Sequence, residues 1–294
     1  MSQSLVVLGT GLIGGSLGKA ACAFAEFDTV WAVNRLAHTN DLAIELGVAD
    51  KAATYDELET VAKTLSAGDI VVVAVPVGVY QAVFELLKPL LPSGVVVTDV
   101  GSSKVTIIES AKAVWGEALD FFVPGHPIAG SEKTGVAAAN AELFKGRRCI
   151  LTPDARTDPK AIDAVRSLWR SVGSEVDLMD AGHHDDVLAA TSHLPHILAY
   201  AIVDALYTLE QKTEIFRYAA GGFRDFTRIA ASDPVMWRDI FLANKASILH
   251  QLDNFEAHLA DLRSAIETNN SSDIDAILER SQGTRKLFSE LQSK

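Results

Sequence analysis

The first half of the chain alternates short, almost wholly apolar runs with stretches of mixed polarity. The apolar runs occupy residues 4–8, 29–33, 69–76 and 94–101. Runs of this length without polar alternation are typical of parallel strands that are buried on both faces of a sheet. Residues 42–46, between two such runs, read as a helix because Gly47 follows them as a stop signal. Strands that alternate with helices predict an α/β fold built on a doubly wound parallel sheet.

From residue 180 onward the pattern changes to long helical segments without a convincing strand. Residues 185–209 read as one extended helix, and Pro195 within it predicts a kink because proline removes a backbone hydrogen bond. Ser272 is expected to cap the N-terminus of the last helix. We therefore expect two domains, an α/β domain over residues 1–179 and an all-α domain over residues 180–294.

Composition is that of a globular protein from a reducing compartment. Of the 294 residues, 48% are hydrophobic and 22% are charged, which suffices for a core and an ordinary surface. The net charge of −12 argues against nucleic acid or an anionic membrane as the main partner. Cys22 and Cys149 have no metal-type spacing. We see no signal peptide and no apolar run that could span a bilayer, so we expect a cytoplasmic protein.

Three glycines with dinucleotide-type spacing stand directly after the first apolar run, within residues 9–14. Gly9 would make the tight turn, Gly11 would let a pyrophosphate approach the backbone, and Gly14 would pack the next helix on the sheet. The strand–turn–helix context favours a Rossmann-type dinucleotide site over a merely flexible glycine loop. The residues expected to line the cofactor are Gly9, Gly11, Leu12, Ile13 and Gly14 of this turn, with Val75 and Pro76 at the end of a later strand.

The second apolar run ends in Asn34 and Arg35 instead of an acid. An Asp or Glu about 20 residues after the glycine turn would bind the ribose 2′-hydroxyl of NAD. A neutral amide tolerates a 2′-phosphate, and a guanidinium can bind one through charge-assisted hydrogen bonds. We therefore favour NADP, although an Arg35 that stacks on the adenine would let the protein take either NADP or NAD.

A polar cluster in residues 125–135 follows the apolar residues 121–123, and it contains His126 among three glycines, two hydroxyls, an acid and a lysine. A strand ending at His126 would leave the imidazole at the carboxyl edge of the sheet, where ligands bind. An imidazole there can accept a proton near neutral pH. Ser102 would lie at the same edge and could bond a reacting oxygen. The alternatives are that His126 belongs to a polar surface loop and that Ser102 merely caps a helix.

The helical half carries two histidines and an arginine that could serve a site. His193 and His196 lie three residues apart on adjoining parts of one helix face. Neither this pair nor the cluster at residues 183–186 has the spacing of helical zinc sites, so we expect no metal. Arg228 would be costly to bury unpaired, so it either pairs with a nearby acid or binds a substrate carboxylate.

Five motifs together resemble the prephenate/arogenate dehydrogenase family, whose members make the aromatic ring of tyrosine. The motifs lie at residues 9–14, 98–102, 125–132, 192–196 and 223–228. The resemblance covers essentially the whole chain, and the last three motifs are far more specific than the glycine turn. We expect neither a fused chorismate mutase nor a C-terminal regulatory domain. Asn34 and Arg35 depart from the acidic end of the second strand in NAD-preferring members.

The resemblance implies an NAD(P)-dependent oxidative decarboxylation of prephenate, arogenate or both. By family likeness His126 accepts the proton of the ring hydroxyl, and Ser102 holds that hydroxyl in line. Arg228 would bind a substrate carboxylate with help from His196, while Glu132 would pair with Arg228 or accept the ammonium of arogenate. The substrate-binding residues implied by the motifs are His196, Arg228, Glu132, Ser131 and Ser192.

Two other functions stay open from the residues alone. A dehydrogenase of the β-hydroxyacid type would need a catalytic lysine on the long helix, and residues 185–209 contain no lysine. A cofactor-binding sensor without turnover would keep the glycine turn but has no need of His126, His196 and Arg228 together. We also expect a homodimer through the helical half, because its amphipathic helices exceed what one sheet-packed domain can cover.

Overall fold

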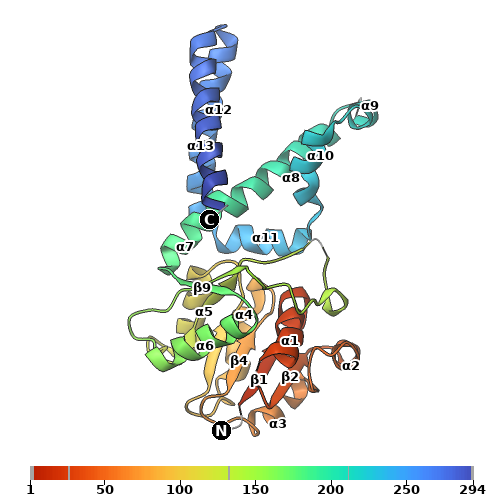
Figure 1. The fold of residues 1–294 in the computed structure, drawn as a ribbon, viewed down its shortest axis with the longest axis vertical. Helices are drawn as coiled ribbons and strands as arrows, with labels where there is room; N and C mark the ends of the chain where they lie inside the picture. Colours follow the sequence, from red (N-terminus) through yellow and green to blue (C-terminus); the bar gives the residue numbers. More distant parts are fainter. Residues whose placement is uncertain (1–2, 26, 132, 211, 293–294) are drawn as a thin grey trace. The chain divides into compact units, whose positions relative to one another are not determined.

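The computed structural model describes residues 3–25, 27–131, 133–210 and 212–292. Its central feature is a six-stranded sheet with the strand order β3-β2-β1-β4-β5-β6 (Figure 1). The strands are β1 (Ser4–Leu8), β2 (Thr29–Asn34), β3 (Lys51–Thr54), β4 (Ile70–Val73), β5 (Val96–Asp99) and β6 (Phe122–Val123). Every neighbouring pair is parallel. This is the doubly wound arrangement that the sequence predicts, and its ligands bind where the strand order reverses, beside β1 and β4.

Helices cover both faces of this sheet. They are α1 (Leu12–Phe24), α2 (Ala37–Glu45), α3 (Leu58–Ala62), α4 (Tyr80–Leu87), α5 (Val105–Trp115) and α6 (Pro159–Ser171), with short 3₁₀ turns η1 (Tyr55–Glu57), η2 (Val77–Val79) and η3 (Val136–Ala138). Leu5 and Val7 of β1 belong to one buried cluster with residues of α1 and α6. Val6 and Leu8 belong to a second cluster with residues of α4 and α5. Because successive strand side chains point to opposite faces, β1 needs an uninterrupted apolar run.

A second, smaller sheet contains His126. Its strands are β7 (Gly125–Pro127), β8 (Arg148–Leu151) and β9 (Glu175–Leu178), of which β7 and β8 are antiparallel and β8 and β9 are parallel. The expectation that a strand of the parallel sheet ends at His126 was therefore wrong. The chain leaves the main sheet at Pro124, which has no N–H for the ladder, and His126 pairs with Ile150 instead.

The helix expected over residues 185–209 begins earlier and is not regular throughout. It consists of α7 (Ala181–Leu188), a π-helical turn η4 (Ala189–His193) and α8 (Leu194–Tyr207). Pro195 lies in the first turn of α8, where its missing N–H is tolerated. A π turn, a feature that is frequent at functional sites, stands just before the proline. The kink at Pro195 stays a prediction.

The remaining helices divide between two compact units, Met1–Lys245 and Ala246–Lys294. The first unit also contains α9 (Lys212–Arg217), α10 (Gly221–Thr227), η5 (Arg228–Ala231) and α11 (Pro234–Ala243), while α12 (Lys245–Glu267) and α13 (Ser271–Gln292) form nearly all of the second. The cap of α13 is Asn270, whose Oδ1 accepts the N–H of Asp273 at 3.3 Å, so the expectation of Ser272 was wrong. The domain boundary expected after residue 179 stays a prediction.

One helical stretch among the described residues, Ala181–Tyr207, is long and apolar enough by length and composition to cross a membrane. The sequence did not lead us to expect such a stretch. A single one is weak evidence for a span, since helices packed inside proteins meet the same criterion. Here His184 and Asp185 at its α7 end are buried and bonded to each other within the protein.

Candidate active site

At two of its three positions, the glycine turn after β1 leaves no room for a side chain. Gly9 has φ +89°, and a Cβ on it would lie 2.6 Å from the carbonyl oxygen of Ala74. A Cβ on Gly14 would lie 2.0 Å from the carbonyl oxygen of Gly9. Gly11, in contrast, would meet no atom within 4 Å. The open space over Gly11 is where a pyrophosphate would approach the N-terminus of α1, so the turn fits a dinucleotide.

Asn34, at the end of β2, is bonded within the protein. Its Oδ1 accepts the N–H of Thr10 at 2.8 Å, and its Nδ2 donates to Thr10 Oγ1 and Asn40 Oδ1, each at 2.8 Å. Asn40 in turn donates to the carbonyl of Ala53 at 2.7 Å. Asn34 thus ties the glycine turn to β3 and brings no negative charge to this edge of the sheet. Arg35, the next residue, is exposed.

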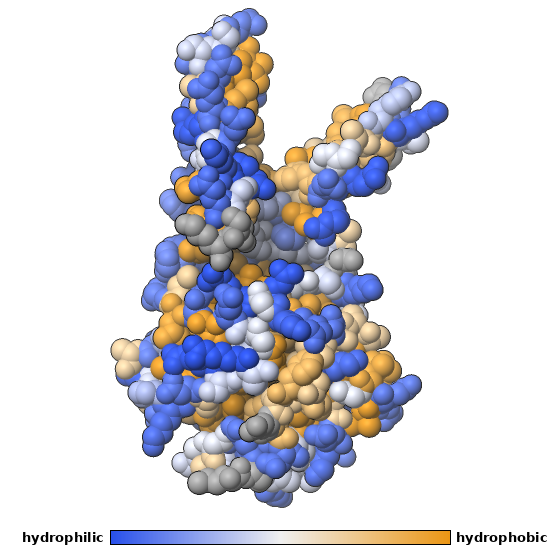
Figure 2. Space-filling view, viewed as in Figure 1, coloured by the Kyte–Doolittle hydropathy of each residue, from blue (hydrophilic) through white to orange (hydrophobic). Residues whose placement is uncertain are grey.

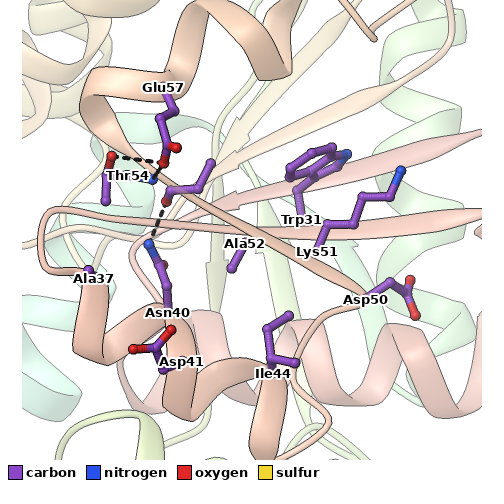
Figure 3. Close-up of a pocket in the computed structure, with 11 residues that line it drawn as sticks. Trp31, Ala37, Asn40, Asp41, Ile44, Asp50, Lys51, Ala52, Thr54 and Glu57 are labelled. Carbon is purple, nitrogen blue, oxygen red and sulfur yellow. Dashed lines mark hydrogen bonds between the residues drawn. The ribbon is translucent and has the colours of Figure 1, made fainter.

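A hollow of about 490 Å³ lies beside this network, between α2 and the edge strand β3 (Figure 3). Its lining includes Asp41, Asp50 and Glu57, and Lys51 lies over the ring of Trp31 at 5.2 Å. None of the residues that the sequence assigned to cofactor or substrate lines it. The predicted site is instead assembled at the carboxyl ends of β1, β4 and β5.

A buried ion pair, which the sequence did not lead us to expect, holds this end of the sheet together. Asp99 and Lys104 are both fully buried, and Lys104 Nζ lies 2.5 Å from Asp99 Oδ2 and 2.6 Å from the carbonyl oxygen of Gly125. Asp99 also accepts the N–H groups of Gly101, at 2.8 Å, and Gly125, at 3.0 Å. These bonds fix the segment that carries Ser102 against the strand that carries His126. The signal in the sequence that could have indicated this pair is Asp99, an acid within an otherwise apolar strand.

His126 begins a chain of three titratable groups that runs into the helical half. Its Nδ1 lies 2.9 Å from Nε2 of His184, and Nδ1 of His184 lies 2.8 Å from Oδ1 of Asp185. The Asp185 carboxylate also accepts the N–H groups of Lys104, at 2.8 Å, and Val105, at 3.0 Å, which are the first donors of α5. His184 and Asp185 belong to the cluster weighed above as a metal site, but both ring nitrogens of His184 are occupied by protein groups.

Burial controls the protonation of this cluster. Burial, and after it electrostatic interactions with His184, Lys104 and His193, holds the pKa of His126 well below its ordinary value. His126 is therefore neutral at physiological pH and can accept a proton. Burial tends to raise the pKa of Asp185, but hydrogen bonds from His184 and from the backbone at Lys104 and Val105 outweigh it and lower that pKa.

His196 has a different environment from His126. Its Nδ1 donates to the carbonyl oxygen of Ser192 at 2.9 Å, and its ring stacks on Trp237 with centroids 3.6 Å apart. Burial and then the charge of Arg228 lower the pKa of His196, which places Arg228 near it. His193, in the π turn, is buried and lies 3.2 Å from Asn244, and burial lowers its pKa to about 4.

The other predicted substrate residues are less constrained in the structure. Ser102 and Ser192 are half-buried, while Ser131 is exposed and accepts the N–H of Lys133 at 3.2 Å. Arg228 is exposed, and no ion pair to it occurs among the described residues. Glu132 lies outside the described residues. The structure therefore brings His126 and Ser102 onto adjoining segments, and Arg228 near His196.

Val75 and Pro76 follow β4 as expected, half-buried and exposed respectively. The side chain of Val75 packs within 3.2 Å of where a Cβ on Gly9 would stand. Leu12 and Ile13 begin α1 and are half-buried. Leu12, Ile13 and Val75 therefore lie at the glycine turn, at the edge where the cofactor is predicted. Their contact with a cofactor stays a prediction.

Comparison with known proteins identifies two consecutive domains. A family model described as prephenate dehydrogenase, nucleotide-binding domain, matches residues 18–178, and one described as prephenate dehydrogenase, dimerization domain, matches residues 180–280. The cyclohexadienyl dehydrogenase of Zymomonas mobilis is 38% identical over 286 residues, which are 97% of this chain and 94% of that protein.

Two solved structures resemble the whole chain. Prephenate dehydrogenase from A. aeolicus, in complex with hydroxyphenyl propionate and NAD+, superposes with a TM-score of 0.90 at 33% identity and covers 98% of this chain and 99% of its own. Synechocystis arogenate dehydrogenase superposes with a TM-score of 0.82 at 27% identity and covers 97% and 100%. With both domain models matched and a relative aligned over nearly its full length, the chain belongs to the prephenate dehydrogenase family.

Proposed function

We propose that this protein catalyses the oxidative decarboxylation of prephenate, arogenate or both, with NAD or NADP as the oxidant. The observation that carries the proposal is a buried, neutral His126, whose Nδ1 is bonded to His184 and whose neighbour Gly125 is bonded to the Asp99–Lys104 pair. A sensor without turnover would not require a proton acceptor at this position.

In the proposed mechanism His126 accepts the proton of the substrate ring hydroxyl. The hydride from the same carbon is taken up by the nicotinamide of the bound cofactor. Ser102 hydrogen-bonds the ring hydroxyl and aligns it with His126. The carboxylate on the opposite ring carbon leaves as carbon dioxide, its electron pair completes the aromatic ring, and the ring oxygen takes back the proton from His126 to give a phenol. The low pKa of His126 keeps the imidazole neutral, so that one of its ring nitrogens can accept a proton in this step.

Arg228 is proposed to bind a substrate carboxylate. A guanidinium matches a carboxylate in a bidentate geometry, and Arg228 is exposed beside His196. Because Nδ1 of His196 is committed to Ser192, its Nε2 is the nitrogen left for substrate. Ser131, Ser192 and Glu132 complete the proposed substrate-binding set, with Glu132 as partner of Arg228 or of the arogenate ammonium.

NADP is the proposed preferred cofactor. Asn34 brings no carboxylate that would repel a 2′-phosphate, and its amide is fixed by Thr10 and Asn40. Arg35, directly after it, is free to bind that phosphate at the surface. The substitution Arg35→Gln should raise the KM for NADP about tenfold, equivalent to about 1.4 kcal/mol, and leave that for NAD unchanged. The exposed Arg170→Gln is the matched control, and an equal effect on both cofactors would contradict this role of Arg35.

A homodimer through the helical half is proposed as well. Large apolar side chains stand exposed on its helices (Figure 2), and the matching family model is described as a dimerization domain. These side chains include Ile202, Tyr207, Phe216, Tyr218, Phe226, Leu242, Leu249, Leu259, Ile266, Leu278 and Leu287. An apolar surface of this extent is unusual for a monomer. Light scattering at assay concentration should give twice the mass of one chain, and a monomer would contradict the proposal.

The decisive assay measures initial rates with prephenate or arogenate, each with NAD and with NADP, from the absorbance of the reduced nicotinamide. Turnover of either substrate supports the proposed reaction. Folded protein that binds cofactor but turns over neither substrate would favour the sensor alternative. A lower KM for NADP than for NAD would support the assignment of Arg35.

A further inference from the structure

We propose that His184 and Asp185 are positioning residues: His184 accepts a hydrogen bond from His126 throughout proton transfer, and Asp185 orients His184, so that His126 is held in one tautomer. This inference rests on the proposed function, because it concerns the base of that reaction. Neither residue needs to touch substrate or cofactor. Both act through the imidazole of His126, which His184 contacts at 2.9 Å.

The tautomer follows from the direction of the hydrogen bonds. The pKa of Asp185 is lowered, so its carboxylate is ionised and can only accept, which assigns a proton to Nδ1 of His184. With this proton on Nδ1, the ring of His184 presents Nε2 as its acceptor. It accepts the Nδ1–H of His126 across 2.9 Å. His126 is consequently left with an unprotonated Nε2, which is the nitrogen that a proton acceptor needs.

Burial strengthens the hydrogen bonds of His184, because it keeps water away from them. His184 is fully buried, so no water competes for its ring nitrogens, and Asp185 is 3% exposed. The groups that face His126 from other elements are Lys104, whose positive charge opposes a charged imidazole, and His193. An imidazolium formed in such a setting gains most from an acceptor that is already in place. His184 supplies that acceptor, with the negative charge of Asp185 behind it.

Asp185 also links the two halves of the site. Its carboxylate accepts the first N–H groups of α5, next to the segment with Ser102, and its carbonyl accepts Nδ2 of Asn244 at 2.8 Å. If Asp185 only caps α5 and does not act on His126 through His184, then a substitution of His184 should leave the reaction rate unchanged. The two roles make different predictions for substitutions at position 184, which is therefore the better place to test.

The test compares three substitutions. His184→Leu removes the acceptor while filling the buried space, and His184→Gln keeps an amide oxygen that can accept from His126. His183→Gln, one residue away on the exposed side of α7, is the matched control. We expect His184→Leu to lower kcat about 10–100-fold, as the loss of comparable supporting hydrogen bonds does. The KM for the cyclohexadienyl substrate should change less than about twofold. His184→Gln should recover much of the rate, and His183→Gln should match the wild type.

A second readout does not depend on turnover. In protein labelled with ¹⁵N-histidine, NMR should show His126 of the wild type protonated at Nδ1 and not at Nε2. In His184→Leu the ring should change to the other tautomer or to a mixture, while thermal denaturation confirms a folded protein.

A His184→Leu protein with wild-type kcat, or a His126 tautomer that is the same in both proteins, would overturn the proposal. If wild-type protein turned over neither substrate, the proposed reaction would fail, and the tautomer measurement would still decide the role of His184.

Discussion

The two parts of the site, the glycine turn and the cluster around His126, are built in opposite ways. The turn is compact: Gly9, Gly11 and Gly14 lie within six consecutive residues, and the atoms that most closely exclude a Cβ are the backbone oxygens of Gly9 and of Ala74, the residue after β4. The cluster is assembled from far apart in the chain, since His126 meets His184 across 58 positions and Lys104 meets Asp185 across 81. Local sterics set the first part, and buried charge and hydrogen bonding set the second.

This contrast predicts that the largest effect on catalysis comes from the cluster. His126→Asn should lower kcat about 10²–10⁴-fold, the usual contribution of a general base, because an amide cannot accept the proton. Cofactor affinity should stay within about twofold, because the turn is a separate structure. Stopped-flow kinetics and fluorescence titration with NADPH measure the two quantities. A parallel loss of both would show that the two parts are not independent.

The buried ion pair should dominate stability. Lys104→Met leaves the Asp99 carboxylate buried without its cation and should lower the free energy of unfolding by about 3–5 kcal/mol. The double substitution Asp99→Asn with Lys104→Met should recover part of this loss, because no uncompensated charge remains. Urea unfolding followed by circular dichroism measures both variants. A loss below about 1 kcal/mol for Lys104→Met would mean that water or a rearrangement compensates Asp99.

Within the turn, two glycines should respond differently to the same substitution. Gly14→Ala places a Cβ against the carbonyl of Gly9 and should lower Tm, whereas Gly11→Ala meets no protein atom and should leave Tm unchanged. Gly11→Ala should instead weaken cofactor binding, by about 1.4–2.7 kcal/mol or 10–100-fold, if the pyrophosphate lies over it. Differential scanning fluorimetry with and without NADP separates the outcomes. An unchanged cofactor Kd in Gly11→Ala would place the pyrophosphate elsewhere.

The smallest effect expected is a shift of the pH dependence of kcat/KM toward lower pH. Burial and nearby positive charges lower the pKa of His126, so the base stays unprotonated as pH falls through the ordinary histidine value of about 6.5. The kcat/KM should therefore remain level at pH 6.5 and decline only at lower pH, as His126 becomes protonated. Initial rates between pH 5 and 8 in buffers of constant ionic strength provide the measurement. A decline centred at or above pH 6.5 would indicate a solvated His126.

Much of the fold was predictable because its causes are periodic and local. Uninterrupted apolar runs mark strands buried on both faces, as β1 shows with its alternate residues in two clusters. The departure at Pro124 and the cap at Asn270 were missed for a different reason. The strand that residues 125–127 pair with, and the side chain that caps α13, depend on how the segments pack, which the sequence pattern does not show.

The sequence by itself determined the glycine turn, the doubly wound sheet, the helical second half and the presence of His126, Arg228 and His196 in family motifs. Only the tertiary structure decided that His126 leaves the main sheet for a strand beside β8, and that His184 and Asp185 stand behind it. The physical reason is the range of the interactions. Backbone sterics and hydrophobic periodicity act between near neighbours, whereas the desolvation and pairing of Asp99, Lys104 and Asp185 exist only once distant segments have buried them together.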